Sequence, residues 1–343
     1  METHSSFERR LWLFSPRADF WLACGGASAG ILAAIVLIFI HGDRELDAVD
    51  FVLSEFHLGA TYDAVIRRRL WHYRRIDVLA VPLSILALSY ALALGGQTIV
   101  LTSIAMYAAV WHRGRQSFGV ARFYQRQVGG AVSRAHDLLF RGAVYLPMVA
   151  AMLAYTHLAP KNYEDEPYLA LNLGAEATAL VGIAAALCVG AYLGWLLWRR
   201  LSAGNRAPER LIHPGEWWVV LAHAVAFGSS YAFGASNASF LLVLAVHHEV
   251  QYLYFTYAMS RRLPGFQALG RTAAEAPTGS HSRPPIAEAE HAASFFLWPV
   301  IGFTAAAVGG WLQFAWLAPL GIGGLFCHYW LDGRIWTRRS FQN

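Results

Sequence analysis

Long apolar runs recur along the chain, and short polar or basic segments separate them. A helix needs about 20 mostly apolar residues to cross the hydrocarbon core of a bilayer. The pattern therefore predicts an all-α, polytopic transmembrane bundle with about ten spans of roughly that length. The predicted spans are Phe20–His41, Phe51–Ile66, Val78–Leu94, Thr98–His112, Gly142–Ala159, Leu169–Trp198, Trp217–Gly234, Leu241–Met259, Phe295–Gly309 and Trp311–Trp330.

The second predicted span, Phe51–Ile66, is short and carries polar residues, so the distribution of positive charge decides whether it crosses. Lys and Arg collect in the cytoplasmic loops of membrane proteins. If this segment spans, all but two of the 27 Lys and Arg residues lie on one side, and the exceptions are Arg44 and Lys161. If it is re-entrant, the three N-terminal arginines move to the acidic side. We therefore predict that it spans and that both termini are cytoplasmic.

The overall composition agrees with a membrane protein. Hydrophobic residues make up 56% of the 343 residues and charged residues only 14%, whereas a soluble domain has about 25% charged residues. The net charge of +5 is sorted by side of the membrane and does not indicate a nucleic-acid partner. We expect an integral protein of a bacterial inner membrane. Residues 1–343 should form a single transmembrane domain, with a flexible cytoplasmic loop at about Leu263–Ala292, which is rich in Pro, Ala, Gly and Ser.

Several kinds of site are disfavoured by the absence of their motifs. The three cysteines form no CxxC pair, which argues against a disulfide framework and a thiolate metal site. No glycine-rich nucleotide-binding loop and no GxSxG elbow occurs, so nucleotide-binding and serine-hydrolase functions lack support.

Histidine interrupts the apolar pattern inside several predicted spans. An ionisable side chain within a bilayer is costly and usually has a functional partner. The span Leu241–Met259 carries adjacent His247 and His248 followed by Glu249, and other spans carry single histidines. Imidazoles combined with oxygen donors suit iron, zinc, manganese or copper. The predicted metal ligands are His57, His112, His247, His248 and His328, gathered at one site in the cytoplasmic half of the bilayer.

Polar residues one helical turn after three of these histidines are predicted to orient the imidazoles. Positions four apart share one stripe of a helix, and a ligating histidine usually bonds a polar group through its second nitrogen. The pairs are His112 with Gln116, His247 with Gln251, and His328 with Asp332. His223 is a further predicted supporting residue. Glu249 and Asp332 are the predicted catalytic residues, and Glu249 could serve as a ligand or a proton relay.

Basic residues also cluster beside the second and fourth predicted spans, interleaved with aromatic residues. Such segments usually act as positively charged anchors at the cytoplasmic interface. The same guanidinium groups could hold an anionic lipid headgroup at the mouth of the site. The predicted headgroup residues are Arg67, Arg68, Arg115 and Arg122.

Three histidine-containing stretches, WHRGRQ, HHEVQY and HYWLDG, resemble parts of the integral-membrane, histidine-rich non-haem iron oxidases, a class that includes lipid and isoprenoid hydroxylases and desaturases. The resemblance implies histidine-bound non-haem iron, as one ion or a pair. It also implies oxidation of an apolar or lipid-like substrate among the membrane lipids. The chain contains no redox domain of its own, so such an oxidase needs an external electron donor.

Other functions stay open on the sequence alone. Single histidines on separate spans could be axial ligands of a haem, for example His112 with His248 or His57 with His328, or could belong to a quinone protein. Intramembrane carboxylates could form the relay of a proton- or metal-coupled transporter. A scaffold in which the histidines only join helices by hydrogen bonds is the remaining possibility.

Overall fold

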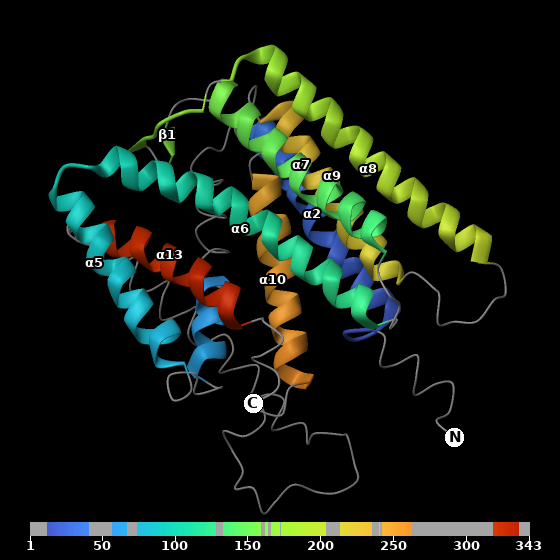
Figure 1. Cartoon of the computed structure of the whole chain (residues 1–343), viewed down its shortest axis with the longest axis horizontal. Helices are drawn as coiled ribbons and strands as arrows, with labels where there is room; N and C mark the ends of the chain where they lie inside the picture. Colours follow the sequence, from blue (N-terminus) through green and yellow to red (C-terminus); the bar gives the residue numbers. More distant parts are fainter. Residues whose placement is uncertain are drawn as a thin grey trace, which may run out of the picture. The chain divides into compact units, whose positions relative to one another are not determined.

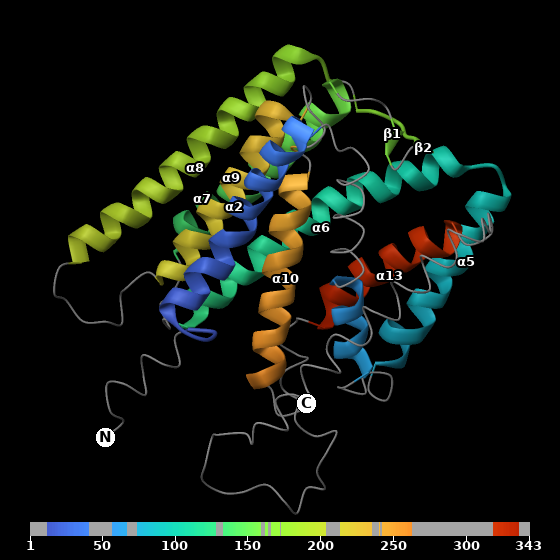
Figure 2. The ribbon, with the colours of Figure 1, turned by 180° about the vertical axis from the view of Figure 1, so that it is seen from behind.

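The computed structural model describes residues 12–40, 57–66, 74–127, 133–158, 162–163, 166–171, 173–203, 213–234, 240, 242–262 and 318–335. Regular structure in these residues is helical (Figures 1 and 2), apart from one antiparallel pair of two-residue strands, β1 (Asn162–Tyr163) and β2 (Glu166–Pro167). The prediction of a helical protein is therefore confirmed. The predicted loop at 263–292 and the predicted span at 295–309 lie outside the described residues.

Contacts within the chain group its residues into two compact units. Unit 1 comprises Met1–Asp50 and Ala109–Tyr252, and unit 2 comprises Phe51–Ala108 and Leu253–Asn343. Two long helices, α6 (Thr98–Gln127) and α10 (Leu242–Arg262), contribute one part to each unit. The prediction of a single transmembrane domain stays a prediction.

Unit 1 is built from four further helices that pack against one another. They are α2 (Pro16–Ile40), α7 (Arg134–Leu158), α8 (Ala175–Ala203) and α9 (Pro214–Phe233). Helix α7 packs against α8 and α9, and α2 packs against α9. Small residues let α2 approach α10 closely, because a Cβ added to Gly30 would lie 2.9 Å from the Cα of Val243. The core between these helices includes Ala27, Met148, Ala222, Phe227 and Val243.

A buried carboxylate joins α6, α7, α8 and α9. Glu216, in the first turn of α9, accepts hydrogen bonds at Oε1 from Gln125 Nε2 at 2.6 Å and from His136 Nε2 at 2.8 Å. The hydroxyl of Tyr192 on α8 also donates to this oxygen. All four side chains are buried. Because a buried carboxylate is costly unless donors surround it, this network fixes how α6, α7, α8 and α9 meet.

Unit 2 contains the helical residues 57–66, a π-helical turn η1 (Ile76–Ala80), α5 (Val81–Leu94), and α13 (Ala318–Ile335). Helix α5 packs along α13, and a Cβ added to Gly323 would lie 2.9 Å from Leu86 of α5. A turn at residues 95–96 leads into α6, and Gly96 adopts φ 70°, a conformation that favours glycine.

Three helical segments in the described residues are long and apolar enough to cross a membrane: Ile76–Leu94, Arg134–Ala154 and Ala175–Ser202. They correspond to the third, fifth and sixth predicted spans. The number is smaller than the ten predicted. In α10 the reason is physical, because the polar side chains between His247 and Gln251 lower the hydropathy of a helix that is otherwise long enough. The finding is compatible with a membrane protein.

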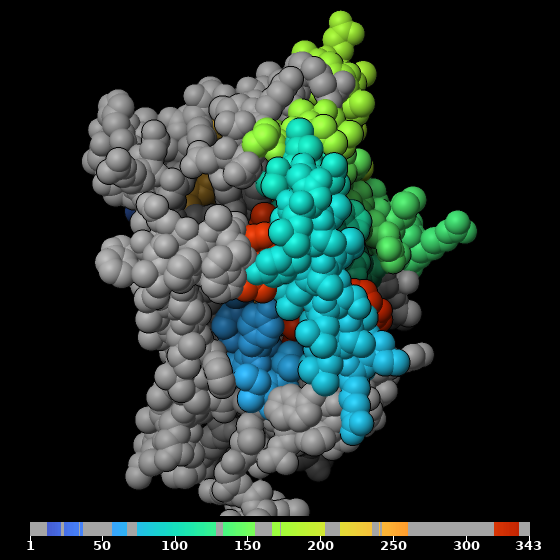
Figure 3. All heavy atoms as spheres, turned by 90° about the vertical axis from the view of Figure 1, so that its left-hand side faces the viewer, coloured from blue at the N-terminus to red at the C-terminus, as the bar shows by residue number. Residues whose placement is uncertain are grey.

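Two of these segments expose their apolar side chains instead of burying them. Only 6% of the apolar window in Ile76–Leu94 and 17% of that in Ala175–Ser202 is buried within the protein. Figure 3 shows the outer face of α5 at the surface of unit 2. Large exposed side chains in the segment Ile76–Leu94 include Leu79, Leu83, Leu88 and Leu94, and those on α8 include Leu180, Ile183 and Leu187. Contiguous apolar surface of this kind is typical of a face covered by lipid or by another protein.

The Glu216 network generates a prediction about stability. Glu216→Gln keeps the shape of the side chain but removes its charge, and hydrogen bonds to a charged acceptor are the stronger ones. We expect a loss of about 1–3 kcal/mol, seen as a lower thermal midpoint in tryptophan fluorescence of the protein in detergent. Glu176→Gln changes an exposed carboxylate on α8 and should lower the midpoint less. Equal midpoints for both variants would contradict the role given to Glu216.

Candidate metal centre

The predicted site residues are buried in both units. Unit 2 holds His57, His328 and Asp332, with exposed fractions of 3%, 1% and 8%. Unit 1 holds His112, His223, His247, His248, Glu249 and Gln251, all buried, and the partly buried Gln116. Ionisable groups withdrawn from water to this degree need partners, so the contacts of each group decide its chemistry.

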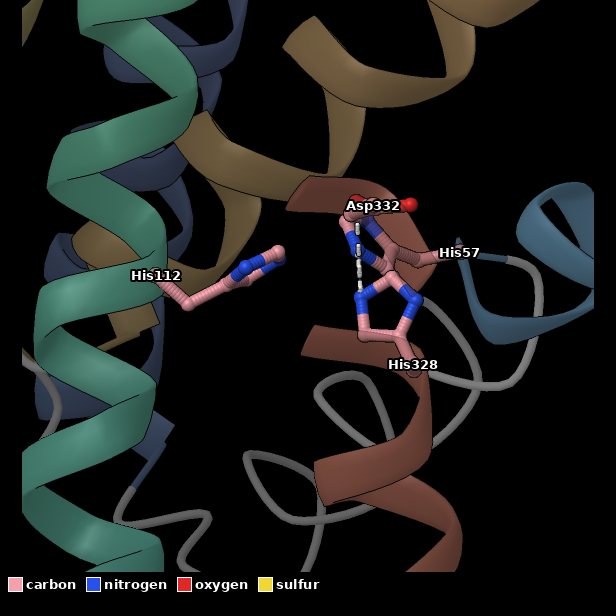
Figure 4. A group of neighbouring side chains, drawn as sticks. All are labelled: His57, His112, His328 and Asp332. Atoms are coloured by element: carbon pink, nitrogen blue, oxygen red, sulfur yellow. Dashed lines mark hydrogen bonds and ion pairs between the residues drawn. The ribbon is translucent and has the colours of Figure 1, made fainter. Parts of the chain in front are cut away.

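The group in unit 2 comes from two short stretches of helix. His57 and Thr61 lie one turn apart in helix 57–66, and His328 and Asp332 lie one turn apart on α13. The Nε2 atoms of the two histidines are 2.6 Å apart (Figure 4), and their rings meet edge to face at 77°. Thr61 Oγ1 lies 2.8 Å from both His328 Nδ1 and Asp332 Oδ1.

These hydrogen bonds determine which nitrogen of His328 carries a proton. With Asp332 ionised, its carboxylate only accepts, so the single hydroxyl hydrogen of Thr61 points to Asp332. Thr61 Oγ1 must then accept from His328, which places the imidazole proton on Nδ1. A neutral His328 therefore presents the lone pair of Nε2 toward His57. Thr61 thus links Asp332 to His328, and Asp332 Oδ2 also lies 3.8 Å from His328 Nε2; the predicted role of Asp332 in orienting the imidazole stays a prediction.

His57, His328 and Asp332 together could hold a metal ion. Each offers one ligand atom, and these atoms lie within 4.8 Å of one another. Two imidazoles and one carboxylate are the donor set of many non-haem iron sites. Two ligand atoms that each lie about 2.1 Å from an ion, with a right angle between their bonds to it, are about 3 Å apart. Binding would therefore require the two Nε2 atoms, now at 2.6 Å, to separate by only a few tenths of an ångström.

Unit 1 brings together a second part of the predicted site. The rings of His112 on α6 and His248 on α10 lie 5.0 Å apart, edge to face. The ligand atoms of His248 and Glu249 lie within 4.8 Å of each other. Gln116 Nε2 donates to the backbone oxygen of His248 at 2.8 Å and to Gln251 Oε1 at 3.2 Å. These two glutamines thus join α6 to α10; their predicted role in orienting imidazoles stays a prediction.

His247 and His223 occupy a different part of unit 1. The backbone of His247 packs against α2, where a Cβ added to Gly26 would lie 3.1 Å from the His247 Cα. Neither ring nitrogen of His247 has a hydrogen-bond partner among the described residues. His223 Nε2 donates to the Val144 carbonyl oxygen at 2.9 Å. Within the described part of the chain, neither histidine belongs to a group of three or more potential metal ligands.

The arginines predicted to hold a headgroup differ in their surroundings. Residues 67–68 lie outside the described residues. Arg115 is exposed, and its Nη1 donates to the Tyr145 hydroxyl at 3.0 Å. Arg122 forms an ion pair with Asp137, and partial burial lowers the pKa of Arg122 below its ordinary value. Of the two predicted headgroup arginines that the structure describes, Arg115 presents its charge to the surroundings, whereas Arg122 is paired with Asp137.

Thr61 belongs to the group in unit 2 but is not among the site residues predicted from the sequence. It stands four residues after His57 on the same helical stripe, and this spacing is the signal that identifies it. Comparison of the chain with protein-family models, with curated proteins and with solved structures finds no significant match. Any function proposed for this chain therefore rests on the chemistry of its own residues.

The tautomer of His328 can be measured. Nitrogen NMR of isotope-labelled histidine should show His328 protonated on Nδ1, because Thr61 accepts there, with Thr61→Val lowering the population of that tautomer. His223 is a matched internal control, because its bond to a carbonyl oxygen requires the proton on Nε2. Signals would be assigned by their loss in H328Q and H223Q. A His328 signal protonated on Nε2 alone would contradict the proposed order of donors and acceptors.

Proposed function

We propose that this protein is an integral-membrane metalloenzyme whose histidines bind non-haem iron and which oxidises an apolar or lipid-like substrate from the cytoplasmic half of the bilayer. The observation that carries the proposal is the buried group of His57, His328 and Asp332, with Thr61 fixing the tautomer of His328. The predicted arrangement of ten spans with cytoplasmic termini in a bacterial inner membrane belongs to this proposal.

The donor set favours iron in a non-haem site. Two imidazoles and a carboxylate leave coordination positions open for dioxygen and substrate on a non-haem iron(II) ion. A haem between His57 and His328 fits this geometry poorly. Axial ligands on opposite faces of a haem iron lie about 4 Å apart, whereas the two Nε2 atoms are 2.6 Å apart. The rings would have to move much further for a haem than for a shared ion.

An apolar groove in unit 2 supports a lipid-like substrate. The groove has a volume of about 430 Å³ and is lined by helix 57–66, η1, α5 and α13. Its lining includes Cys327 and Leu331, which directly precede His328 and Asp332 in the sequence, and Leu79 of η1, which is 49% exposed. Because the outer face of α5 exposes apolar side chains to the surroundings, an alkyl or isoprenoid chain could enter from the bilayer. We propose that the groove holds the apolar chain of the substrate.

The proposed reaction consumes dioxygen and two electrons. In hydroxylation, a C–H bond of the substrate becomes C–OH with one oxygen atom, and the other atom leaves as water. Two protons and two electrons complete the balance, and an external electron carrier supplies the electrons. The contribution of the protein is to position the substrate and to keep the site dry: helix 57–66 and α13 bury the polar group, which strengthens its electrostatic interactions.

Metal content gives the direct test. Protein purified from iron-supplemented cells should contain at least stoichiometric iron by elemental analysis. His328→Ala and His57→Ala should each lower it, because each removes one of three ligands. Thr61→Val should weaken affinity about 10–100-fold, as loss of a ligand-orienting partner does. His281→Ala, in the predicted loop, is the control. Wild-type protein with sub-stoichiometric iron, zinc, manganese and copper would refute the proposal.

The groove provides a second test, with product formation as the readout. The iron-loaded protein would be incubated with a reductant, a total lipid extract and isotopically labelled dioxygen. Mass spectrometry should detect a lipid that has gained one labelled oxygen or lost two hydrogens. Leu79→Trp fills the groove and should lower product formation at least about tenfold, the scale of a lost or blocked apolar subsite, without changing iron content. Leu83→Trp, exposed on α5 outside the lining, should leave both unchanged. Equal effects of the two variants would argue against the groove.

A further inference from the structure

The apolar groove of unit 2 follows two helical segments that run in opposite directions. Toward one end, Gly323 of α13 closely approaches Leu86 of α5. Toward the other, Val78 of η1, which continues into α5, packs in one core cluster with Leu331 of α13. The groove lining therefore has two ends, one at Leu86 and Gly324 and one at Val78 and Leu331.

Charged side chains lie next to the end of the groove at Val78 and Leu331. Asp77 directly precedes Val78, and Arg334 follows Leu331 by three residues, which places it on the adjoining turn of α13. Arg334 Nε lies 3.5 Å from Asp77 Oδ1. Arg74 Nη1 donates to the backbone oxygen of Arg334 at 3.2 Å. These contacts hold the start of η1 against the last turn of α13.

Positive charge exceeds negative charge at this end of the groove. With the exposed Arg75, the charged cluster consists of Arg74, Arg75, Asp77 and Arg334. Three guanidinium groups and one carboxylate give these four side chains a net charge of +2. Guanidinium groups bind carboxylates and phosphates through paired hydrogen bonds. Because Asp77 can offset only one of the three positive charges, the cluster can still bind an anion.

Trp330 gives this end of the groove the character of a membrane interface. Its Nε1 donates to the backbone oxygen of Asp77 at 2.9 Å, and the guanidinium carbon of Arg334 lies 4.3 Å from its ring centroid. Tryptophan and arginine are typical of the boundary between lipid and water. Farther along α5, Leu83 and Leu88 are exposed and apolar. The groove therefore joins a charged end to an apolar surface, as the binding site of an amphiphile does.

We propose that the groove in unit 2 binds a lipid with an anionic headgroup, a carboxylate or a phosphate. Arg74, Arg75 and Arg334 hold the headgroup, and the apolar chain runs along the groove toward Gly324. The inference rests on the proposed function, in which the groove holds the chain of the substrate, and it names the class and the orientation of that substrate. Of the arginines predicted from the sequence for this role, Arg115 and Arg122 belong to unit 1.

The test uses two photoreactive probes that share a chain and differ in headgroup. Ten residues of helix separate Arg334 from Gly324, a rise of about 15 Å and about the length of an extended chain of twelve carbons. Dodecyl phosphate and dodecanol, each with a diazirine at the end of the chain, would be added to the full-length protein in nanodiscs of phosphatidylcholine. The phosphate probe should label the protein at a concentration at least about fivefold lower, the scale of one arginine near an anionic lipid. Mass spectrometry should locate its cross-link near Leu86 or Gly324.

Variants of the charged cluster separate the headgroup from the chain. Arg75→Gln and Arg334→Gln should each weaken labelling by the phosphate probe about fivefold and leave labelling by dodecanol unchanged. Arg334→Lys keeps the charge and should restore most of the loss. Arg200→Gln removes an exposed positive charge at the end of α8 in unit 1, so it is the matched control for general attraction of anions. Leu79→Trp should weaken labelling by both probes.

Several results would overturn the inference. They are equal labelling of the wild-type protein by the two probes, losses in R75Q and R334Q no larger than in R200Q, and a cross-link at the charged cluster. Loss of both probes in R75Q and R334Q would overturn it as well, because contact with a headgroup cannot affect a neutral probe. These measurements need neither iron nor turnover. Iron-containing protein that does not distinguish the probes would keep the proposed function and lose the inference, whereas iron-free protein that selects the phosphate would do the reverse.

Discussion

A polar group removed from water is costly unless it finds a partner, and this cost shapes much of the candidate site. In unit 2 the constraint is met by a chain of hydrogen bonds that runs from Asp332 through Thr61 to His328 and on to His57. Each member is at most 8% exposed. Because a hydroxyl has only one hydrogen, an ionised Asp332 would set the direction of every bond in the chain. The result is a lone pair on His328 that faces a second imidazole.

The same constraint separates structural histidines from candidate ligands in unit 1. His136 donates to Oε1 of Glu216, and Gln125 and Tyr192 donate to the same oxygen. His136 is therefore part of a network that joins helices. His223 is bonded to a backbone carbonyl oxygen. His112 and His248 instead face each other with a carboxylate nearby. Burial alone therefore does not identify a metal site; the kind of partner does.

The exposed apolar surface bears on how the proposed substrate could reach the buried group in unit 2. The segments Ile76–Leu94 and Ala175–Ser202 bury little of their apolar surface within the protein, which in water would be unfavourable by about 25 cal/mol for each square ångström exposed. A bilayer removes that cost. In unit 2, the groove lined by helix 57–66, η1, α5 and α13 includes Leu79, which is 49% exposed on the apolar segment Ile76–Leu94; the proposed lipid-like substrate could enter it without passing through water.

Much of the architecture follows from local patterns in the sequence. The lengths of the apolar runs predicted helices, and the structure confirms helices at nearly all of the predicted spans that it describes. The spacing of His328 and Asp332, and of His57 and Thr61, placed each pair on one helical stripe, because side chains four apart share a face. The number of candidate spans among the described residues is smaller than predicted, and in α10 the reason is that polar side chains lower the hydropathy of a long helix.

The sequence by itself determined that this is a helical, largely apolar protein with ionisable residues inside its apolar segments. Only the tertiary structure decided which of those residues meet. His57 and His328 are 271 positions apart, and no periodicity relates them. His247 and His248 are neighbours in the chain, yet the ring of His248 lies 5.0 Å from that of His112 on α6, whereas neither ring nitrogen of His247 has a hydrogen-bond partner among the described residues; successive side chains on a helix point about 100° apart. Helical periodicity is a local property, whereas the partner that each face meets is set by long-range packing.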